Sequence, residues 1–447
     1  MKKSIIILLM AVMPGLTGHL ASAQEKPWSL QECIGYALDH NLTVQQRELQ
    51  VRQREIDANT ARNSRLPGVS AGSSQNFSFG RGLTEDNTYA HTNTTNTSFT
   101  LGADMTLFNG FRIRNNILLG ELNLKAATAD LEKARDDIRV AVAQAYVQIL
   151  YQREITEVAV RQVAIDSLQV ERLETLLANG KATSADVAAQ RASLAQSRLS
   201  AVQADNRLQL ARLDLAQLLE LPSPEGFDVA TPAGDALELP LPAGPESIYE
   251  EAVGIKPAVQ AEETRLAYAE RNIDLARGGY FPSLSLSGGL GTNYYTSSGY
   301  AGKRFFDQLS NNFSQYIGLS LNIPVFSRLT TRNQVRSARV NYDLQQLQLE
   351  SVKKQLYKEI QQAWYNALTA RSKFESSTQA ASAAEESFAL MQAKYENGKA
   401  SITEFNESKN QYLKACSDLA QARYEYLYQT RLLDFYRGRT LSLGKEH

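Results

Sequence analysis

The chain carries two regions in which apolar and polar residues alternate, as they do along a β-strand with two unlike faces. In the first region, apolar side chains occupy every second position from Phe99 to Leu107, and small or polar residues stand between them. A looser alternation runs from Val69 to Phe79, and the polar stretch 81–96 separates the two. The pattern predicts a strand pair at about 68–108. Its two strands, of about 10 residues each, are joined by a polar loop and have the length that a tilted strand needs to cross a bilayer.

A second strand pair is predicted at about 283–325. Leu284, Leu286 and Leu290 alternate with serines and glycines, and Ile317 begins a similar alternation that ends at Ile323. The loop between these strands is rich in aromatic residues: Tyr294, Tyr295, Tyr300, Phe305, Phe306 and Phe313. Aromatic side chains at strand ends are typical of a membrane–water interface, and the alternative is a hydrophobic patch on a soluble sheet.

Most of the remaining chain has a helical pattern. A helix predicted from about Phe111 to Ala178 contains no proline and would be roughly 100 Å long. A return helix predicted from about Ser184 to Leu221 has an apolar residue every seven positions, which is the repeat of packed coiled helices. The segment 179–182, Asn-Gly-Lys-Ala, lies between the two helices. Because Gly accepts the positive φ that ends a helix, we expect this segment to be the tip of an antiparallel helical hairpin.

The same tetrapeptide recurs at 397–400, 218 positions later, between two further helical patterns. Phe405, Tyr412 and Tyr426 continue the seven-residue spacing, each 218 positions after its counterpart in the first return helix. The chain therefore has two copies of one unit. We expect a first repeat at 24–220, a proline-rich linker at 221–245, a second repeat at 246–438 and a tail at 439–447.

The first residues predict export. Lys2 and Lys3 precede a short apolar run, and Ala21-Ser-Ala23 follows it, so residues 1–23 are expected to be a signal peptide; the alternative is a membrane anchor. Beyond it there is no apolar run of about 18 residues, so an exported chain is either soluble or held in an outer membrane by strands. Cys33 and Cys416 do not occupy matching positions in the two repeats, and their pairing stays open.

Composition and motifs argue against nucleic-acid binding and catalysis. The net charge of the 447-residue chain is −1 and its hydrophobic content is 43%, values that suggest neither disorder nor a nucleic-acid partner. The segment 68–72 matches G-x-S-x-G, but that motif needs a strand–turn–helix context, and a strand pattern continues through it. The histidines after the signal, His40, His91 and His447, do not have metal-ligand spacing. We expect no enzyme activity, cofactor or metal.

Four strands in one chain cannot close a barrel, and open strand edges cannot face lipid. If the strands span a membrane, several copies of the chain must share one barrel. Two copies would give eight strands and a filled interior, whereas three would give twelve strands and room for a pore. The long helices of the same copies would then form a hollow cylinder.

The order of these features resembles the outer membrane efflux protein (TolC) family. The features are the signal peptide, two repeats that each hold a helix, a strand pair and a long hairpin, the segment 107–111 (Leu-Phe-Asn-Gly-Phe), and the Asn-Gly-Lys-Ala tips. The resemblance implies a mainly α fold with a small β part, in which a homotrimer builds a twelve-stranded outer-membrane barrel on a periplasmic helical tunnel. It also implies an exit duct of a tripartite efflux pump or type I secretion system. Its partners would be outer-membrane lipid, a periplasmic adaptor and an inner-membrane transporter.

The resemblance also suggests site residues at the tips. Asp186, Tyr395, Glu404 and Glu407 stand at positions of the family gate, whereas Ala400 replaces the gating arginine. Glu404 and Glu407 share one helical face and could ring a narrow mouth, where they would favour cations; the alternative is an acidic helix start in solvent. Adaptor contacts are expected at both tips, from Asn179, Gly180, Lys181, Asn397, Gly398 and Lys399.

Other classes of protein remain as alternatives. A soluble periplasmic coiled-coil adaptor or structural protein would share the long hairpins, but it needs no amphipathic strand pairs. Fractionation with the outer membrane would exclude that class. A self-contained porin would need more strands than one chain supplies.

Overall fold

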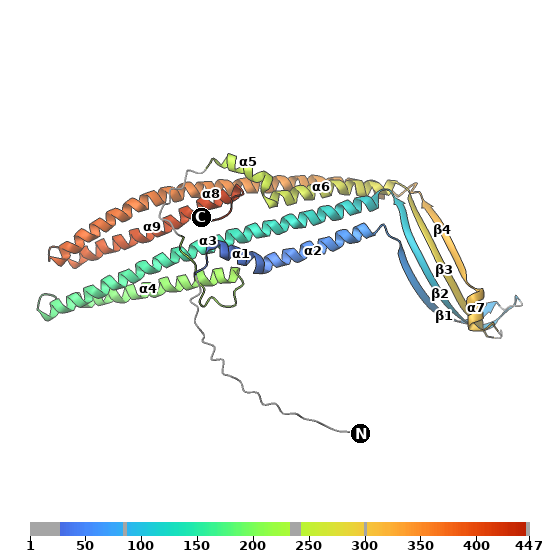
Figure 1. Cartoon of the computed structure of the whole chain (residues 1–447), viewed down its shortest axis with the longest axis horizontal. Helices are drawn as coiled ribbons and strands as arrows, with labels where there is room; N and C mark the ends of the chain where they lie inside the picture. Colours follow the sequence, from blue (N-terminus) through green and yellow to red (C-terminus); the bar gives the residue numbers. More distant parts are fainter. Residues whose placement is uncertain (1–26, 84–86, 233–242, 299–301, 444–447) are drawn as a thin grey trace, which may run out of the picture.

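The computed structural model describes residues 27–83, 87–232, 243–298 and 302–443. The signal peptide expected at 1–23 lies outside these residues, as do parts of the expected linker and tail. Long helices run together through most of the molecule, and a sheet of strands leaves them at one end (Figure 1). Of the helices in the described ranges, none is both long enough and apolar enough to cross a membrane.

The strands form one antiparallel sheet in the order β1–β2–β3–β4. Their bounds are Gly68–Leu83 for β1, Tyr89–Asn109 for β2, Ser283–Ser297 for β3 and Ser314–Asn322 for β4. The two predicted pairs join where β2 lies beside β3, with Leu101 opposite Leu290. The sheet therefore unites the two repeats, and β1 and β4 are its edges.

The prediction of strands about 10 residues long was wrong for the first pair. β1 has 16 residues and β2 has 21, because most of the stretch predicted as a polar loop is paired, as Ser78 with Thr94 shows. Threonine is β-branched and fits a pleated strand, so a run of polar residues does not by itself mark a loop. In the second pair β3 has 15 residues and β4 has 9.

Next to the sheet, four helices lie side by side in the order α2, α3, α6, α8 (Figure 1). Their bounds are Leu42–Asn63, Arg112–Ala178, Pro257–Arg277 and Thr330–Glu396. The helices α3 and α8 have 67 residues each, or roughly 100 Å at 1.5 Å per residue. They reach from the sheet to the opposite end of the molecule.

At that opposite end, α4 (Ser184–Leu218) folds back along α3, and α9 (Ile402–Tyr436) folds back along α8. The predicted hairpins and their bounds near the tips are confirmed. The predicted seven-residue pattern is also confirmed in α4, because its apolar residues Val187, Leu194, Leu208 and Leu215 are buried. A second series, three positions further along the helix, is buried with them: Gln190, Ser197, Ala204 and Ala211. The two hairpins contact each other where α9 packs on α3.

The middle of the molecule holds the largest core. The short helix α1 (Leu30–His40) and the start of the linker cover α3 there, and Trp28 forms a bridge with Val229. The hydroxyl of Tyr146 donates to the carbonyl of Ala230 at 2.5 Å. A smaller core lies under α5 (Pro245–Ile255), which is the counterpart of α1 in the second repeat.

The turn from β2 into α3 requires glycine at position 110. Gly110 has φ +66°, and a Cβ built on it would lie 2.2 Å from the carbonyl oxygen of Gly278. Phe111 follows with φ +63°, a conformation that costs energy in a residue with a side chain. The sheet and the helical region thus meet at a closely packed corner.

Candidate functional site

The two hairpin tips have nearly the same structure. Gly180 and Gly398 have φ +71° and +68°, and the side chains of Asn179 and Asn397 donate to carbonyls of the last helical turn at 2.7 and 2.8 Å. Nothing lies within 4 Å of a Cβ built on either glycine. Positive φ at these glycines ends the helices, and the six residues expected to contact an adaptor, which include Lys181 and Lys399, are all exposed.

Asp186 and Glu404 occupy equivalent places at the starts of α4 and α9. Asp186 accepts hydrogen bonds from the amide and hydroxyl of Thr183, at 3.0 and 2.7 Å. Glu404 accepts the same pair from Ser401, at 2.7 and 2.8 Å. Both are therefore capping boxes, and the bonds from Thr183 and Ser401 lower the pKa of each carboxyl. Glu407 lies one turn further along and is exposed.

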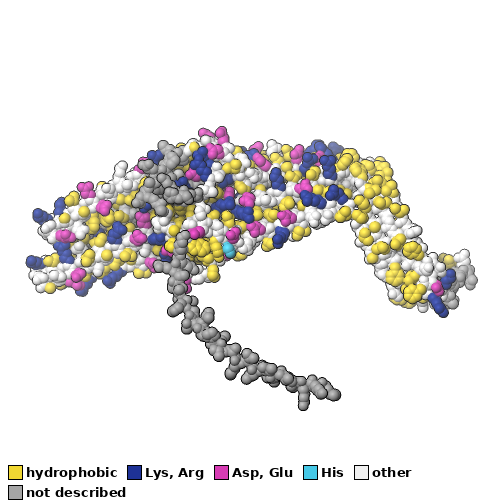
Figure 2. Space-filling view, in the orientation of Figure 1, with side chains coloured by type: hydrophobic (Ala, Val, Ile, Leu, Met, Phe, Trp, Pro, Cys, Tyr) yellow, Lys and Arg dark blue, Asp and Glu magenta, His cyan; other side chains and the backbone are white. Residues whose placement is uncertain are grey.

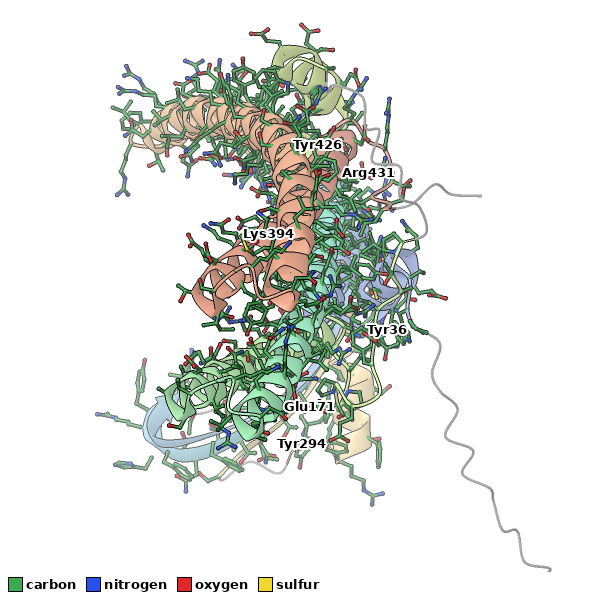
Figure 3. The ribbon with its side chains drawn as sticks, turned by 90° about the vertical axis from the view of Figure 1, so that its left-hand side faces the viewer. Tyr36, Glu171, Tyr294, Lys394, Tyr426 and Arg431 are labelled. Carbon is green, nitrogen blue, oxygen red and sulfur yellow. The ribbon has the colours of Figure 1, made fainter. Side chains whose placement is uncertain are left out.

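Tyr395 is held between the two hairpins. Its ring stacks on Phe405 with centroids 4.9 Å apart, and the guanidinium of Arg172 lies 5.0 Å from the ring centroid. Arg172 also donates to the carbonyl of Glu396 at 2.9 Å. Burial raises the pKa of Tyr395, and the nearby Arg172 acts in the opposite direction. These contacts join α3 to the end of α8, and Figure 3 views the molecule from this end.

Sequence reasoning missed Arg172. The one signal for it is a departure from the repeat, because the position 218 residues later holds Leu390. Ala400, at the position where the resemblance suggested a gating arginine, is half-buried. In this chain a cation does lie near the tyrosine, but it comes from the other hairpin.

A second cluster missed by sequence reasoning lies deeper between the hairpins. Lys409 of α9 forms an ion pair with Asp166 of α3, and their side chains are 1% and 0% exposed. The amide of Gln190 in α4 donates to the same carboxylate oxygen at 3.2 Å. The other oxygen of Asp166 is buried without a hydrogen-bond partner. Three helices thus meet at a buried charge, which the seven-residue pattern did not predict.

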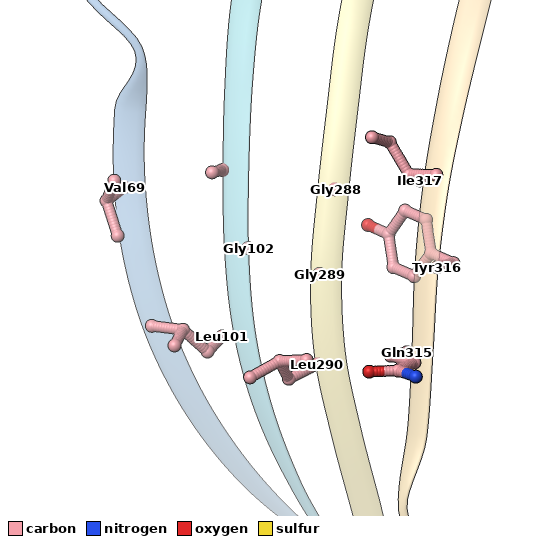
Figure 4. A pocket seen from close by; sticks show the side chains of 10 residues that line it. Val69, Leu101, Gly102, Gly288, Gly289, Leu290, Gln315, Tyr316 and Ile317 are labelled. Atoms are coloured by element: carbon pink, nitrogen blue, oxygen red, sulfur yellow. The ribbon is translucent and has the colours of Figure 1, made fainter.

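The sheet has one apolar face. Apolar residues in register across the strands, such as Val69, Ala103 and Ile317, share that face, while Ser70, Gly102 and their neighbours lie on the other. Apolar side chains gather over the sheet, whereas charged side chains are spread over the helices (Figure 2). A hollow of about 510 Å³ on the sheet is lined by residues of all four strands (Figure 4). Such a surface suits lipid on one side and water on the other.

The G-x-S-x-G match does not have the structural context that this motif needs. The segment 68–72 lies inside β1, in a continuous strand without the turn that a nucleophile needs. Within the described ranges, no group of three or more His, Cys, Asp or Glu side chains is placed to hold a metal ion. Cys33 and Cys416 are both free thiols, and burial raises the pKa of Cys33 to about 12.

Comparison with known proteins identifies the family. The model of the outer membrane efflux protein family matches residues 33–220 and 248–439. The outer membrane efflux protein BepC of Brucella suis is 23% identical, over 80% of this chain and 72% of that protein. Protein CyaE of Bordetella pertussis is 26% identical, over 97% of this chain and 89% of that protein.

A solved structure supports the fold. The CmeC outer membrane channel of Campylobacter jejuni aligns with a TM-score of 0.77 at 16% identity, over 100% of this chain and 96% of that one. The family and its structural relatives are channel proteins. The chain therefore belongs to the outer membrane efflux protein family, and it is an outer-membrane channel that serves as an exit duct for exported substrates.

Proposed function

We propose that three copies of this chain form one continuous conduit, with a barrel of twelve strands in the outer membrane and a tunnel of helices in the periplasm. The observation that carries the proposal is the open sheet of four strands. Its edges β1 and β4 have no partner strand within the described chain. Its apolar face is exposed, with Ile317 81% exposed and Val69 67% exposed. An open edge beside lipid leaves backbone groups unpaired, so neighbouring copies must complete the sheet.

The helices nearest the sheet support the same assembly. At one side of the four-helix layer, α2 exposes apolar residues at seven-residue spacing: Leu42, Leu49 and Ile56. At the other side, α8 exposes Val340, Leu344 and Leu347. Two apolar stripes with this spacing pack together when α8 of one copy meets α2 of the next. Each copy then joins its neighbours through its helices as well as its strands.

The hairpin half continues the wall. The face of α4 away from α3 exposes Leu199, Val202, Leu210 and Leu213. A lone copy would leave this stripe in water, whereas a neighbouring hairpin would cover it. The helical wall would then run without a break for roughly 100 Å, which is the length of α3.

The tips are the proposed contact with the rest of the export machinery. A periplasmic adaptor would bind the exposed loops at 179–181 and 397–399, and an inner-membrane transporter would supply the energy, since no nucleotide-binding motif is present in this sequence. Asp186, Tyr395, Glu404 and Glu407 are the proposed gate residues. Three copies of the exposed Glu407 beside Glu404 would place negative charge around the mouth and favour cations there.

Membrane fractionation and conductance test the proposal together. The full-length protein, expressed with its signal segment, should float with outer-membrane vesicles and not with the soluble periplasm. After purification it should give stable steps of ionic current in a planar bilayer. A protein that stays soluble without detergent would support the alternative of a periplasmic adaptor or structural protein and would refute the conduit.

A further inference from the structure

The strand β3 extends beyond β4 at the end of the sheet farthest from the helices. The β3–β4 ladder ends where Gly291 pairs with Ser314, but β3 continues to Ser297. The short helix α7 (Phe305–Asn311) lies beside the part of β3 that β4 does not reach (Figure 1). The free edge of β3 is therefore covered by a helix.

The helix α7 satisfies backbone groups of β3 as a neighbouring strand would. The side-chain amide of Gln308 accepts from the amide of Tyr295 and donates to its carbonyl, both at 3.0 Å. The Asn312 side chain, next to the helix, donates to the carbonyl of Asn293 at 2.8 Å. The hydroxyl of Thr292 donates to the carbonyl of Leu309 at 2.7 Å. This segment thus takes the place of a longer β4 at the end of the sheet farthest from the helices.

The short length of β4 would also leave a gap between neighbouring copies. In a shared barrel the outer edge of β4 would meet β1 of the next copy, but β4 has 9 residues and β1 has 16. At the helical end of the sheet, β1 begins and β4 ends. When they are matched from that end, the seven β1 residues from Phe77 to Leu83 (16 − 9 = 7) have no β4 residue beside their outer edge. Unpaired backbone groups at the edge of a membrane sheet are costly.

We propose that α7 also fills this gap between copies, by packing against residues 77–83 of β1 of the neighbouring chain. Its residues suit the role. Phe306 and Ser310 lie opposite Gln308 on the helix, because 3.6 residues complete a turn, and Phe306 is 80% exposed. The uncovered part of β1 exposes Phe77 at 59% and Phe79 at 77%.

The proposed contact brings these aromatic side chains together on the apolar face. Phe77 and Phe79 share that face with Val69, since all three are separated by even numbers of residues along β1. Phe306 would pack on them, while the exposed side chains of Asp307 and Ser310 would offer hydrogen bonds to the free edge of β1. In this arrangement α7 closes two strand edges, one in its own chain and one in the next.

Cross-linking between copies tests the contact, which rests on the proposed trimer. We would use full-length protein in which Cys33→Ala and Cys416→Ala remove the native thiols. One variant carries Phe306→Cys with Phe77→Cys, and a parallel variant carries Phe306→Cys with Phe79→Cys. The matched control pairs Phe306→Cys with Val69→Cys. Val69 lies on the same strand and face as Phe77 but 8 residues closer to the helices, or roughly 26 Å away.

After mild oxidation in detergent, at least one test variant should give about ten-fold more chain linked to a second copy than the control, because cysteines more than about 7 Å apart at Cα cannot be bridged. Reductant should abolish the link. Particles of trimer size that give no link in either test variant, or as much link in the control, would overturn the contact and leave the conduit intact. Particles of one chain would overturn both the contact and the trimer.

Discussion

The buried ion pair of Asp166 and Lys409 gives the sharpest test of how the two hairpins of one chain are held together. Lys409→Met removes the cation and keeps a long flexible side chain. The carboxylate of Asp166 then stays fully buried, and of the two hydrogen-bond donors to its Oδ1 only the Gln190 amide is left. A buried charge without a counter-charge is strongly destabilising because solvent cannot stabilise it.

The expected magnitude follows from the burial of the pair. Breaking one side of a buried ion pair costs about 3–5 kcal/mol, whereas replacing both partners by apolar residues is often neutral. The double variant Asp166→Leu with Lys409→Met also leaves the Gln190 amide unpaired, at a cost of about 1–3 kcal/mol. Each single variant should therefore be less stable than the double variant, and the double-mutant cycle should give a coupling energy of at least about 3 kcal/mol.

Urea unfolding in detergent, followed by the helical circular dichroism signal, measures the cycle on the parent, both single variants and the double variant. The matched control is the ion pair of Glu174 and Arg191, whose side chains are 43% and 64% exposed. An exposed pair should give a coupling energy of about 1 kcal/mol or less. If the cycle of Asp166 and Lys409 gives a value as small as that control, the buried pair does not hold the hairpins together.

Three further predictions concern the tips. Arg172→Ala removes a cation–π contact and a hydrogen bond between the hairpins, so amide exchange near Glu396 should become about ten-fold faster, for a loss of about 1.4 kcal/mol; an unchanged rate would contradict the contact. Replacing Glu404 and Glu407 by Ala should shift the reversal potential in a salt gradient toward zero, and an unaltered potential would count against the acidic ring. The pKa values of Asp186 and Glu404 are lowered in the folded protein from 3.8 and 4.5. The capping bonds therefore stabilise the tips at a pH above these ordinary pKa values, and that stabilisation is lost as the pH falls through the lowered pKa values. A spin label at either tip should become more mobile at that acidic pH. A variant without the hydroxyls of Thr183 and Ser401 should lose that pH dependence. If the variant keeps it, the capping boxes are not its cause.

The helical part of the fold could be predicted closely from the sequence. The seven-residue spacing of Val187, Leu194 and Leu208 identified the buried face of α4, and the Asn-Gly pairs identified both tips. These features depend on local periodicity and on glycines that can adopt a positive φ, as Gly180 and Gly398 do, and both signals can be recognised in a single sequence. The lengths of β1 and β2 could not be predicted in this way, because their ends consist of polar residues that are paired in the sheet.

The contacts between the hairpins were beyond sequence reasoning. Asp166 and Lys409 are 243 residues apart, and their pairing depends on how α9 lies against α3. Arg172 and Tyr395 meet for the same reason. Of the two alternatives for Glu404, the acidic helix start accounts for the contacts within one chain. The ring of acids requires neighbouring copies and stays a proposal.

The number of chains in the purified particle tests the central claim most directly, because the described part of one chain forms an open sheet and an open layer of helices. Native mass spectrometry of the detergent-extracted protein measures that number without any substitution. We predict particles of three chains that survive dilution. Particles of a single chain, or of two chains with eight strands, would contradict the account.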